Sequence, residues 1–224
     1  MNARPAYTWQ RDAWITAIAL ALLLAWDVSG LDLPAERLFA DAKGFALRDT
    51  WWTSRLLHDG GRIVSWALLA VFALLGLRQQ GPDEPPRRWR WRWVAVIVFC
   101  ALAVPSLKRV SLTSCPWDLA EFGGIAQYVS HWRFGVSDGG GGHCFPSGHA
   151  VAAFAFFGLH FCWRDYNPRK ARLWLTVVLV LGTMYGAAQL MRGAHYPSHT
   201  LWSAWLCWTI SVLAYHFLRP KDFP

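Results

Sequence analysis

Residues 172–190, RLWLTVVLVLGTMYGAAQL, contain no charged side chain after Arg172 and are mostly apolar. A helix of about 20 such residues crosses the hydrocarbon core of a bilayer. The run lacks the period-two alternation of a transmembrane strand. It therefore predicts a membrane-spanning helix.

Further apolar segments lie on both sides of this run. They occupy residues 13–30, 62–77, 91–107, 149–163 and 200–218. Several are shorter than the roughly 20 residues of an upright span, but flanking Trp and Arg side chains can extend them by snorkelling. Many of the 16 tryptophans stand near segment ends, as interfacial anchors do. The sequence predicts an all-α integral membrane bundle of six transmembrane helices, forming one domain over residues 1–224.

The first segment ends without the small-residue cleavage pattern of a signal peptide, so we expect it to be retained. Residues 27–62, which follow, are polar with scattered aromatic side chains. Such a composition predicts short interfacial helices against the outer leaflet.

The basic residues, which give a net charge of +8, are divided between alternate loops. Thirteen lie on one side: Arg4, Arg11, Arg78, Arg87, Arg88, Arg90, Arg92, Arg164, Arg169, Lys170, Arg172, Arg219 and Lys221. The other loops carry nine basic and nine acidic residues. The positive-inside rule then predicts a multi-pass protein of the bacterial inner membrane with both termini cytoplasmic. Residues 27–62, 108–148 and 191–199 are expected to face the periplasm, and no nucleic-acid partner is expected, since that needs a basic face on a soluble fold.

Residues 139–149, GGGGHCFPSGH, run directly into the fourth apolar segment. Glycines followed by Pro-Ser-Gly at a helix start present backbone N–H groups and a hydroxyl to an anion. His149 would stand beside that anion and donate a proton. The alternative is a flexible loop in which Ser147 serves only as a helix N-cap.

Residues 189–200, QLMRGAHYPSHT, form the last outward segment. Pro197 suits the first turn of a helix, which leaves His195 just outside it. Arg192 can bind a phosphate in bidentate fashion, and His195 can attack it. Lys108 and Arg109, where the third helix ends, either hold a phosphate or mark the membrane boundary.

Together these segments resemble the type 2 phosphatidic acid phosphatase superfamily, whose pattern is K-x6-R-P, P-S-G-H and S-R-x5-H-x3-D. Residues 146–149 match the second element in full, and residues 195–198 match the wording around the third-element histidine. Lys108 and Pro116 match the ends of the first element. The resemblance covers the catalytic half, about residues 100–218.

The chain departs from this pattern in three places. Cys115 stands where the family has arginine, Ala188-Gln189 where it has Ser-Arg, and His199 where it has aspartate. Arg192 lies one helical turn after Gln189 and can replace the missing arginine. His199 could accept a hydrogen bond from the His195 ring but cannot supply the negative charge of a carboxylate.

The resemblance implies a lipid phosphatase that needs no metal or cofactor and acts on the periplasmic face, in contact with membrane lipids. His195 would form a phosphohistidine, and His149 would protonate the leaving oxygen. Lys108, Ser147 and the backbone N–H of Gly148 would hold the phosphate. Arg109, Gln189 and Arg192 are the further candidates for phosphate binding that lie near the missing arginines in the sequence. The expected substrate is a lipid phosphomonoester or pyrophosphate: phosphatidic acid, phosphatidylglycerol phosphate, undecaprenyl pyrophosphate or lipid A.

Two cysteines, Cys115 and Cys144, lie in the outward loop beside the first two motif elements. Outside the cytoplasm an oxidised pair is favoured, so we expect a disulfide between them. Cys100, Cys162 and Cys207 fall within helices and fit small apolar core residues.

Three alternative functions stay open. A phosphotransferase would pass the phosphoryl group to a second lipid instead of water. A binding protein would keep the site without turnover. A metal site on His195 and His199 is disfavoured, because Pro197 between them disrupts a regular helical pair.

Overall fold

The computed structural model describes residues 9–78, 81 and 84–219, so Arg4 and Lys221 of the predicted cytoplasmic charge lie outside the described residues. The long helices are α1 (Trp9–Ser29), α3 (Gly61–Leu75), α4 (Arg87–Lys108), α7 (Pro168–Met191) and α8 (Pro197–Leu218). The short elements are α2 (Asp32–Glu36), strands β1 (Ala40–Asp41) and β2 (Gly44–Phe45), the π-helix η1 (Trp51–Gly60), the 3-10 helices η2 (Pro116–Asp118) and η3 (Ala120–Phe122), α5 (Val151–Phe154) and α6 (Phe157–Trp163).

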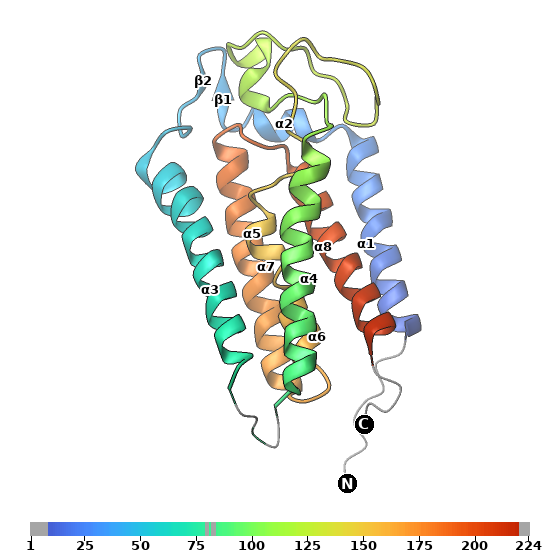
Figure 1. Cartoon of the computed structure of the whole chain (residues 1–224). Coiled ribbons are helices and arrows are strands. Elements are labelled where there is room, and N and C mark those ends of the chain that lie inside the picture. The colour runs from blue at the N-terminus through green and yellow to red at the C-terminus, as the bar shows by residue number, and fades with distance from the viewer. Residues whose placement is uncertain (1–8, 79–80, 82–83, 220–224) are drawn as a thin grey trace.

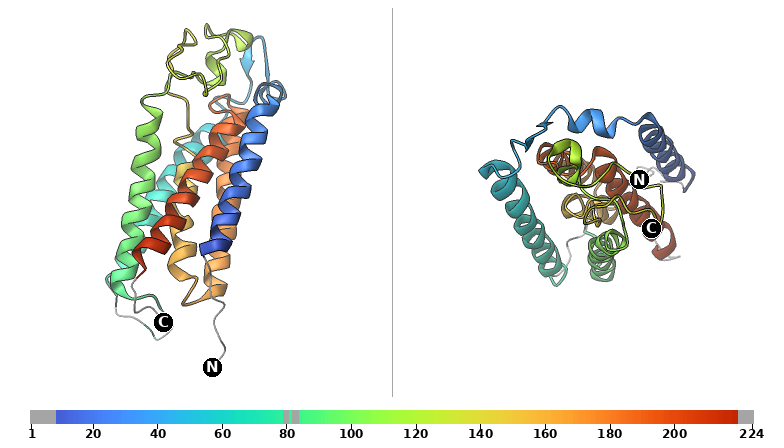
Figure 2. Two further views of the ribbon diagram at one scale, coloured as in Figure 1. Left: turned by 90° about the vertical axis from the view of Figure 1, so that its right-hand side faces the viewer. Right: turned by 90° about the horizontal axis from the view of Figure 1, so that it is seen from above.

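The long helices stand side by side, with α5 and α6 among them and the irregular segments gathered over one end (Figures 1 and 2). Among the described residues, five helical stretches are long and apolar enough to cross a membrane: α1, the joined η1 and α3, α4, α7 and α8. Many of their apolar side chains face outward, as those of a lipid-facing helix do. Trp14, Ile63 and Leu102 are each more than half exposed.

The fourth predicted span, residues 149–163, is not confirmed as a span. It is divided into α5 and α6 by a turn at Ala155 and Phe156, where hydrogen bonds join residues three apart. Both short helices contact α4, α7 and α8, and all residues from Phe157 to Cys162 are buried. Backbone irregularity at this depth is tolerated because protein, not lipid, surrounds it.

The outward segment before α3 differs from the prediction in two ways. Residues 51–60 form a π-helix that continues directly into α3 rather than a separate interfacial helix, so the second apolar helix begins earlier than residue 62. The helix α2 is the short helix expected there, but β1 and β2 form a small antiparallel pair, which the all-α prediction omitted. Phe45 of β2 packs with Phe122 and Tyr196, and this aromatic contact anchors the pair to the outer loops.

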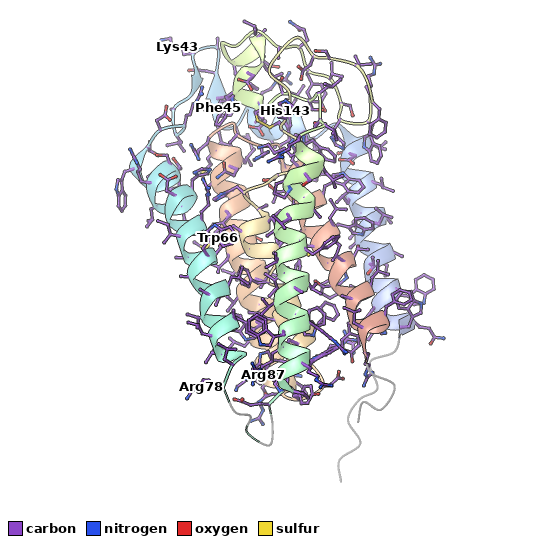
Figure 3. All side chains as sticks on the ribbon, in the orientation of Figure 1. Lys43, Phe45, Trp66, Arg78, Arg87 and His143 are labelled. Carbon is purple, nitrogen blue, oxygen red and sulfur yellow. A yellow bond between two sulfur atoms is a disulfide. The ribbon has the colours of Figure 1, made fainter. Side chains whose placement is uncertain are left out.

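The two ends of the bundle have different chemistry. Arg78 and Arg87 lie at the end opposite Phe45 and His143 (Figure 3). At that basic end, the carboxylate of Asp12 is buried and accepts hydrogen bonds of 3.2 and 2.7 Å from Arg164. This pair joins α1 to the end of α6, so the loops that carry the basic residues meet on one side of the bundle.

Candidate active site

A cavity of about 580 Å³ lies under the outer loops and extends between α3 and α4. Three cationic side chains line it, Arg62, Lys108 and Arg192, and within the described residues no carboxylate does. His149 and His195 also line it. A cavity lined by cationic side chains and by no carboxylate favours an anionic ligand.

The end of α7 positions two of these groups. The N–H of Ala194 donates to the carbonyl of Gln189 and that of Gly193 to Leu190, which is a Schellman motif. Gly193 has φ +68°, and a Cβ there would lie 2.3 Å from the Phe45 ring, so only glycine fits. The chain therefore reverses at Gly193 and presents Arg192 and His195 to the cavity.

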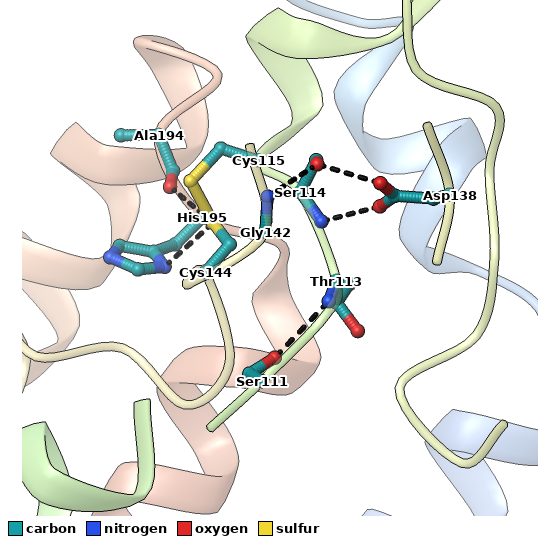
Figure 4. The surroundings of a disulfide bond; sticks show 9 residues. All are labelled: Ser111, Thr113, Ser114, Cys115, Asp138, Gly142, Cys144, Ala194 and His195. Atoms are coloured by element: carbon teal, nitrogen blue, oxygen red, sulfur yellow. Dashed lines mark hydrogen bonds between the residues drawn. A yellow bond between two sulfur atoms is a disulfide. The ribbon is translucent and has the colours of Figure 1, made fainter. Parts of the chain in front are cut away.

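His195 lies between α7 and α8, as predicted, and is 5% exposed. Its Nδ1 is 3.5 Å from the Sγ of Cys144, whose disulfide to Cys115 is the one that the sequence predicts (Figure 4). Burial first, and then the charge of Lys108, hold the pKa of His195 well below its ordinary value. The imidazole is therefore neutral, as a nitrogen nucleophile must be.

The glycine stretch has a structural task rather than the predicted anion-binding one. Asp138 accepts hydrogen bonds from the N–H and hydroxyl of Ser114, and from the N–H of Gly140 (Figure 4 shows the first two). The Ser114 hydroxyl in turn accepts from the N–H of Gly142. None of Gly139 to Gly142 lines the cavity. The glycines thus fasten the outer loop near the disulfide.

His149 stands just before α5 and is held by the π-helix η1. Its Nε2 is 3.3 Å from the carbonyl oxygen of Leu57, and its ring stacks on His58 at 4.4 Å between centroids. A carbonyl can only accept, so Nε2 carries the proton and Nδ1 is the basic nitrogen. Burial, and then the proximity of His58, lower the pKa of His149 to about 3. A bound phosphate would oppose this shift by bringing negative charge close to the ring.

Lys108 and Gly148 lie side by side, since a Cβ on Gly148 would be 3.7 Å from Cδ of Lys108. Within the described part of the chain, the N–H groups of Gly148 and His149 have no hydrogen-bond acceptor. Such free donors suit a phosphate oxygen. Ser147 is fully buried, does not line the cavity, and accepts a hydrogen bond from the N–H of Ala150. The Ser147 hydroxyl thus closes the turn that precedes α5, whose N-cap residue is Ala150.

Gln189 and Arg192 both line the cavity, one turn apart as the spacing predicts. The Gln189 side chain is 2% exposed, and its amide nitrogen has no hydrogen-bond partner among the described residues. The Nε of Arg192 donates to the carbonyl of Arg48 at 2.8 Å. This contact leaves the terminal nitrogens of the guanidinium to bind an anion.

Two predicted site residues lie away from the cavity. Arg109 is exposed one residue beyond α4 and does not line it, so the membrane-boundary alternative fits this residue. His199 is 0% exposed, and neither of its ring nitrogens has a hydrogen-bond partner among the residues that the structure describes. The predicted hydrogen bond to His195 is therefore wrong, because the rings meet at 63° with centroids 5.9 Å apart.

The sequence did not single out His58 or Arg62, which the π-helix and the start of α3 bring to the cavity. Arg62 had a usable signal, since it opens an apolar segment at its outward end. His58 had none, because residues 27–62 were expected to form short interfacial helices separate from the second apolar helix.

Comparison with known proteins agrees with this site. The PAP2 superfamily model matches residues 89–222. Phosphatidylglycerophosphatase B of Escherichia coli K12 is 30% identical over 100 residues, which are 43% of this chain and 36% of that protein. The proteins of that name from Escherichia coli O157:H7 and Shigella flexneri match equally. The match thus covers about a third of the length of these relatives.

No solved structure has significant similarity to the chain. The matched residues nevertheless include Lys108, Gly148, His149 and His195, which all line one cavity. The chain therefore belongs to the PAP2 superfamily.

Proposed function

We propose that this protein is a lipid phosphatase that removes phosphate through a phosphohistidine on His195. One observation carries the proposal: the buried imidazole of His195 and three cationic side chains line the same cavity. The name of the relatives, phosphatidylglycerophosphatase B, supports a lipid phosphate as the substrate.

In the proposed reaction the phosphate lies against Lys108, Arg192 and the N–H of Gly148. The Nε2 of His195 attacks phosphorus, because Nδ1 faces the disulfide, and the bond from phosphorus to the lipid oxygen breaks. Nδ1 of His149, protonated when the phosphate dianion binds, gives its proton to that oxygen. Water activated by the same nitrogen then cleaves the P–N bond and restores both histidines.

The lower part of the cavity suits a lipid tail. Between α3 and α4 its walls include Trp66, Leu69, Ile97 and Ala101, and Trp66 is 63% exposed toward the surrounding medium. Apolar walls beside a cationic end match a phosphate head group with acyl chains. We propose that the lipid enters sideways from the bilayer.

We also propose that the single domain lies in a bacterial inner membrane with the cavity at the periplasmic side. The basic loops at the opposite end support this orientation through the positive-inside rule. A disulfide in the outer loops agrees with an oxidising compartment.

Phosphate release by the purified protein in detergent tests the function. The substrates are phosphatidic acid, phosphatidylglycerol phosphate, undecaprenyl pyrophosphate and lipid A, each with and without EDTA. We expect release that EDTA does not change and that His195→Ala abolishes. Full activity of His195→Ala would refute the mechanism, and transfer to an added acceptor lipid would identify a phosphotransferase.

A further inference from the structure

The position that the family pattern assigns to aspartate holds His199 in this chain. This ring lies in the first turn of α8, does not line the cavity, and has its centroid 5.9 Å from that of His195. A neutral imidazole cannot supply the negative charge that stabilises a positively charged histidine. A counter-charge for His195, if the chain has one, must therefore come from another residue.

The next ring behind His199 is that of His131, from the loop that follows η3. The two ring centroids are 5.7 Å apart at 78°, so the edge of one ring meets the face of the other. His131 also stacks on Phe145 at 4.2 Å, and Phe145 contacts His199 at 5.1 Å. Its side chain is 7% exposed. These three rings pack as one buried group.

A buried carboxylate ends this row of rings. The Oδ2 of Asp27 is 3.4 Å from Nε2 of His131, a close contact without hydrogen-bond geometry, and the Asp27 side chain is 3% exposed. The same oxygen accepts hydrogen bonds from the indoles of Trp202 at 2.9 Å and Trp132 at 3.0 Å. Donors of this kind stabilise a carboxylate away from water. Trp202 follows His199 by about one turn of α8, which connects the carboxylate to the helix that carries His199.

The groups that line the cavity near His195 disfavour a positive charge on its ring, which a carboxylate would oppose. Lys108, His149 and His58 are the charged or titratable neighbours that act on it there, and all three disfavour a positive ring. Attack on phosphorus converts neutral His195 into a positively charged phosphohistidine. A negative charge connected to the His195 ring through residues outside the cavity would favour this step.

We propose that Asp27, His131 and His199 are positioning residues that together replace the aspartate of the family pattern. They form a buried row, Asp27–His131–His199–His195, in which the carboxylate orients and polarises His131 and the packed rings hold His195. The inference rests on the proposed function, since it concerns the same nucleophile.

A double-mutant cycle tests the row. We expect Asp27→Asn to lower kcat about tenfold and to leave KM unchanged. This is the effect expected when one negative charge is removed at the distance that separates Asp27 from His195. His199→Asp places a carboxylate next to His195, so adding Asp27→Asn to it should cost less than about twofold. His131→Phe keeps the stack on Phe145 but removes the ring nitrogens, and we expect the same loss as for Asp27→Asn.

Asp32→Asn is the matched control. Asp32 is also buried and accepts an indole hydrogen bond, from Trp26, but its other partner is Ser198 and not a histidine. Its effect on kcat should be the same with and without His199→Asp. The pH profile of kcat should change in Asp27→Asn and not in Asp32→Asn.

The outcomes separate the two hypotheses. Phosphate release with equal losses from Asp27→Asn in both backgrounds, or wild-type activity of His131→Phe, would overturn the row alone. If Asp27→Asn does not fold, the His131→Phe result decides. Absence of release by the wild-type protein from every lipid would overturn the proposed function and the row with it.

Discussion

Removal of the Cys115–Cys144 disulfide should both destabilise the protein and slow its reaction. The bond closes a loop with a sequence separation of 29. Loop entropy in the unfolded chain then corresponds to about 3.6 kcal/mol of stabilisation. For a chain of this length, that is a decrease in Tm of about 10 °C.

The effect on activity follows from the contact between Cys144 and His195. The sulfur lies 3.5 Å from Nδ1 of the nucleophile, and the bond joins the segment after Lys108 to the segment before Ser147. Without it, both segments can shift relative to His195. Misplacement by about 1 Å can cost about 100-fold, so we expect kcat/KM to fall about 10- to 100-fold.

Thermal unfolding and phosphate release in detergent would measure both effects, for Cys115→Ala/Cys144→Ala and for the wild-type protein treated with reductant. Reductant should have no further effect on the double variant. Cys162→Ala, which removes a buried free thiol, serves as the control for a cysteine outside the site. Unchanged Tm and activity in a protein whose two thiols are fully alkylated would refute the reasoning.

Three further predictions concern the cavity. His149→Asn should lower kcat about 100- to 10,000-fold for a lipid alcohol leaving group, and much less for p-nitrophenyl phosphate, whose leaving group needs no proton; equal losses on both substrates would exclude the acid role. Arg192→Ala should raise KM or lower kcat at least tenfold. Arg109→Ala, which removes an exposed cation, should change neither constant more than about twofold. A larger effect of Arg109→Ala than of Arg192→Ala would show that the wrong arginine was assigned to phosphate binding. Because burial lowers the pKa of His149 to about 3 and that of His195 well below its ordinary value, both rings stay neutral in the folded protein while the unfolded chain takes up protons below pH 6.5. The free energy of unfolding should therefore decrease as the pH is lowered, by up to about 1.4 kcal/mol per pH unit for each of the two histidines. A free energy of unfolding that does not change between pH 6.5 and 4 would contradict this.

The local sequence was sufficient to predict those elements of this protein whose formation depends on residues adjacent in the chain. The apolar runs predicted the five long helices of the described residues, because a bilayer selects helices by composition and length. The turn at Gly193 and the start of α8 at Pro197 depend on residues within one turn of them, so His195 could be placed outside the helix. The motif residues Lys108, Gly148, His149 and His195 were all predicted, and all line one cavity.

Only the tertiary structure decided which side chains meet. The sequence offered Arg109 beside Lys108, but the end of α4 turns Arg109 outward. It offered His199 as a direct partner of His195, whereas packing sets these rings edge to face and places His131 behind them. Asp27 is 104 residues from His131 along the chain, and their contact depends on how α1 and the outer loop pack together. Composition and short spacings therefore determined the long helices and the position of His195 between two of them, while long-range packing determined the groups that surround this histidine.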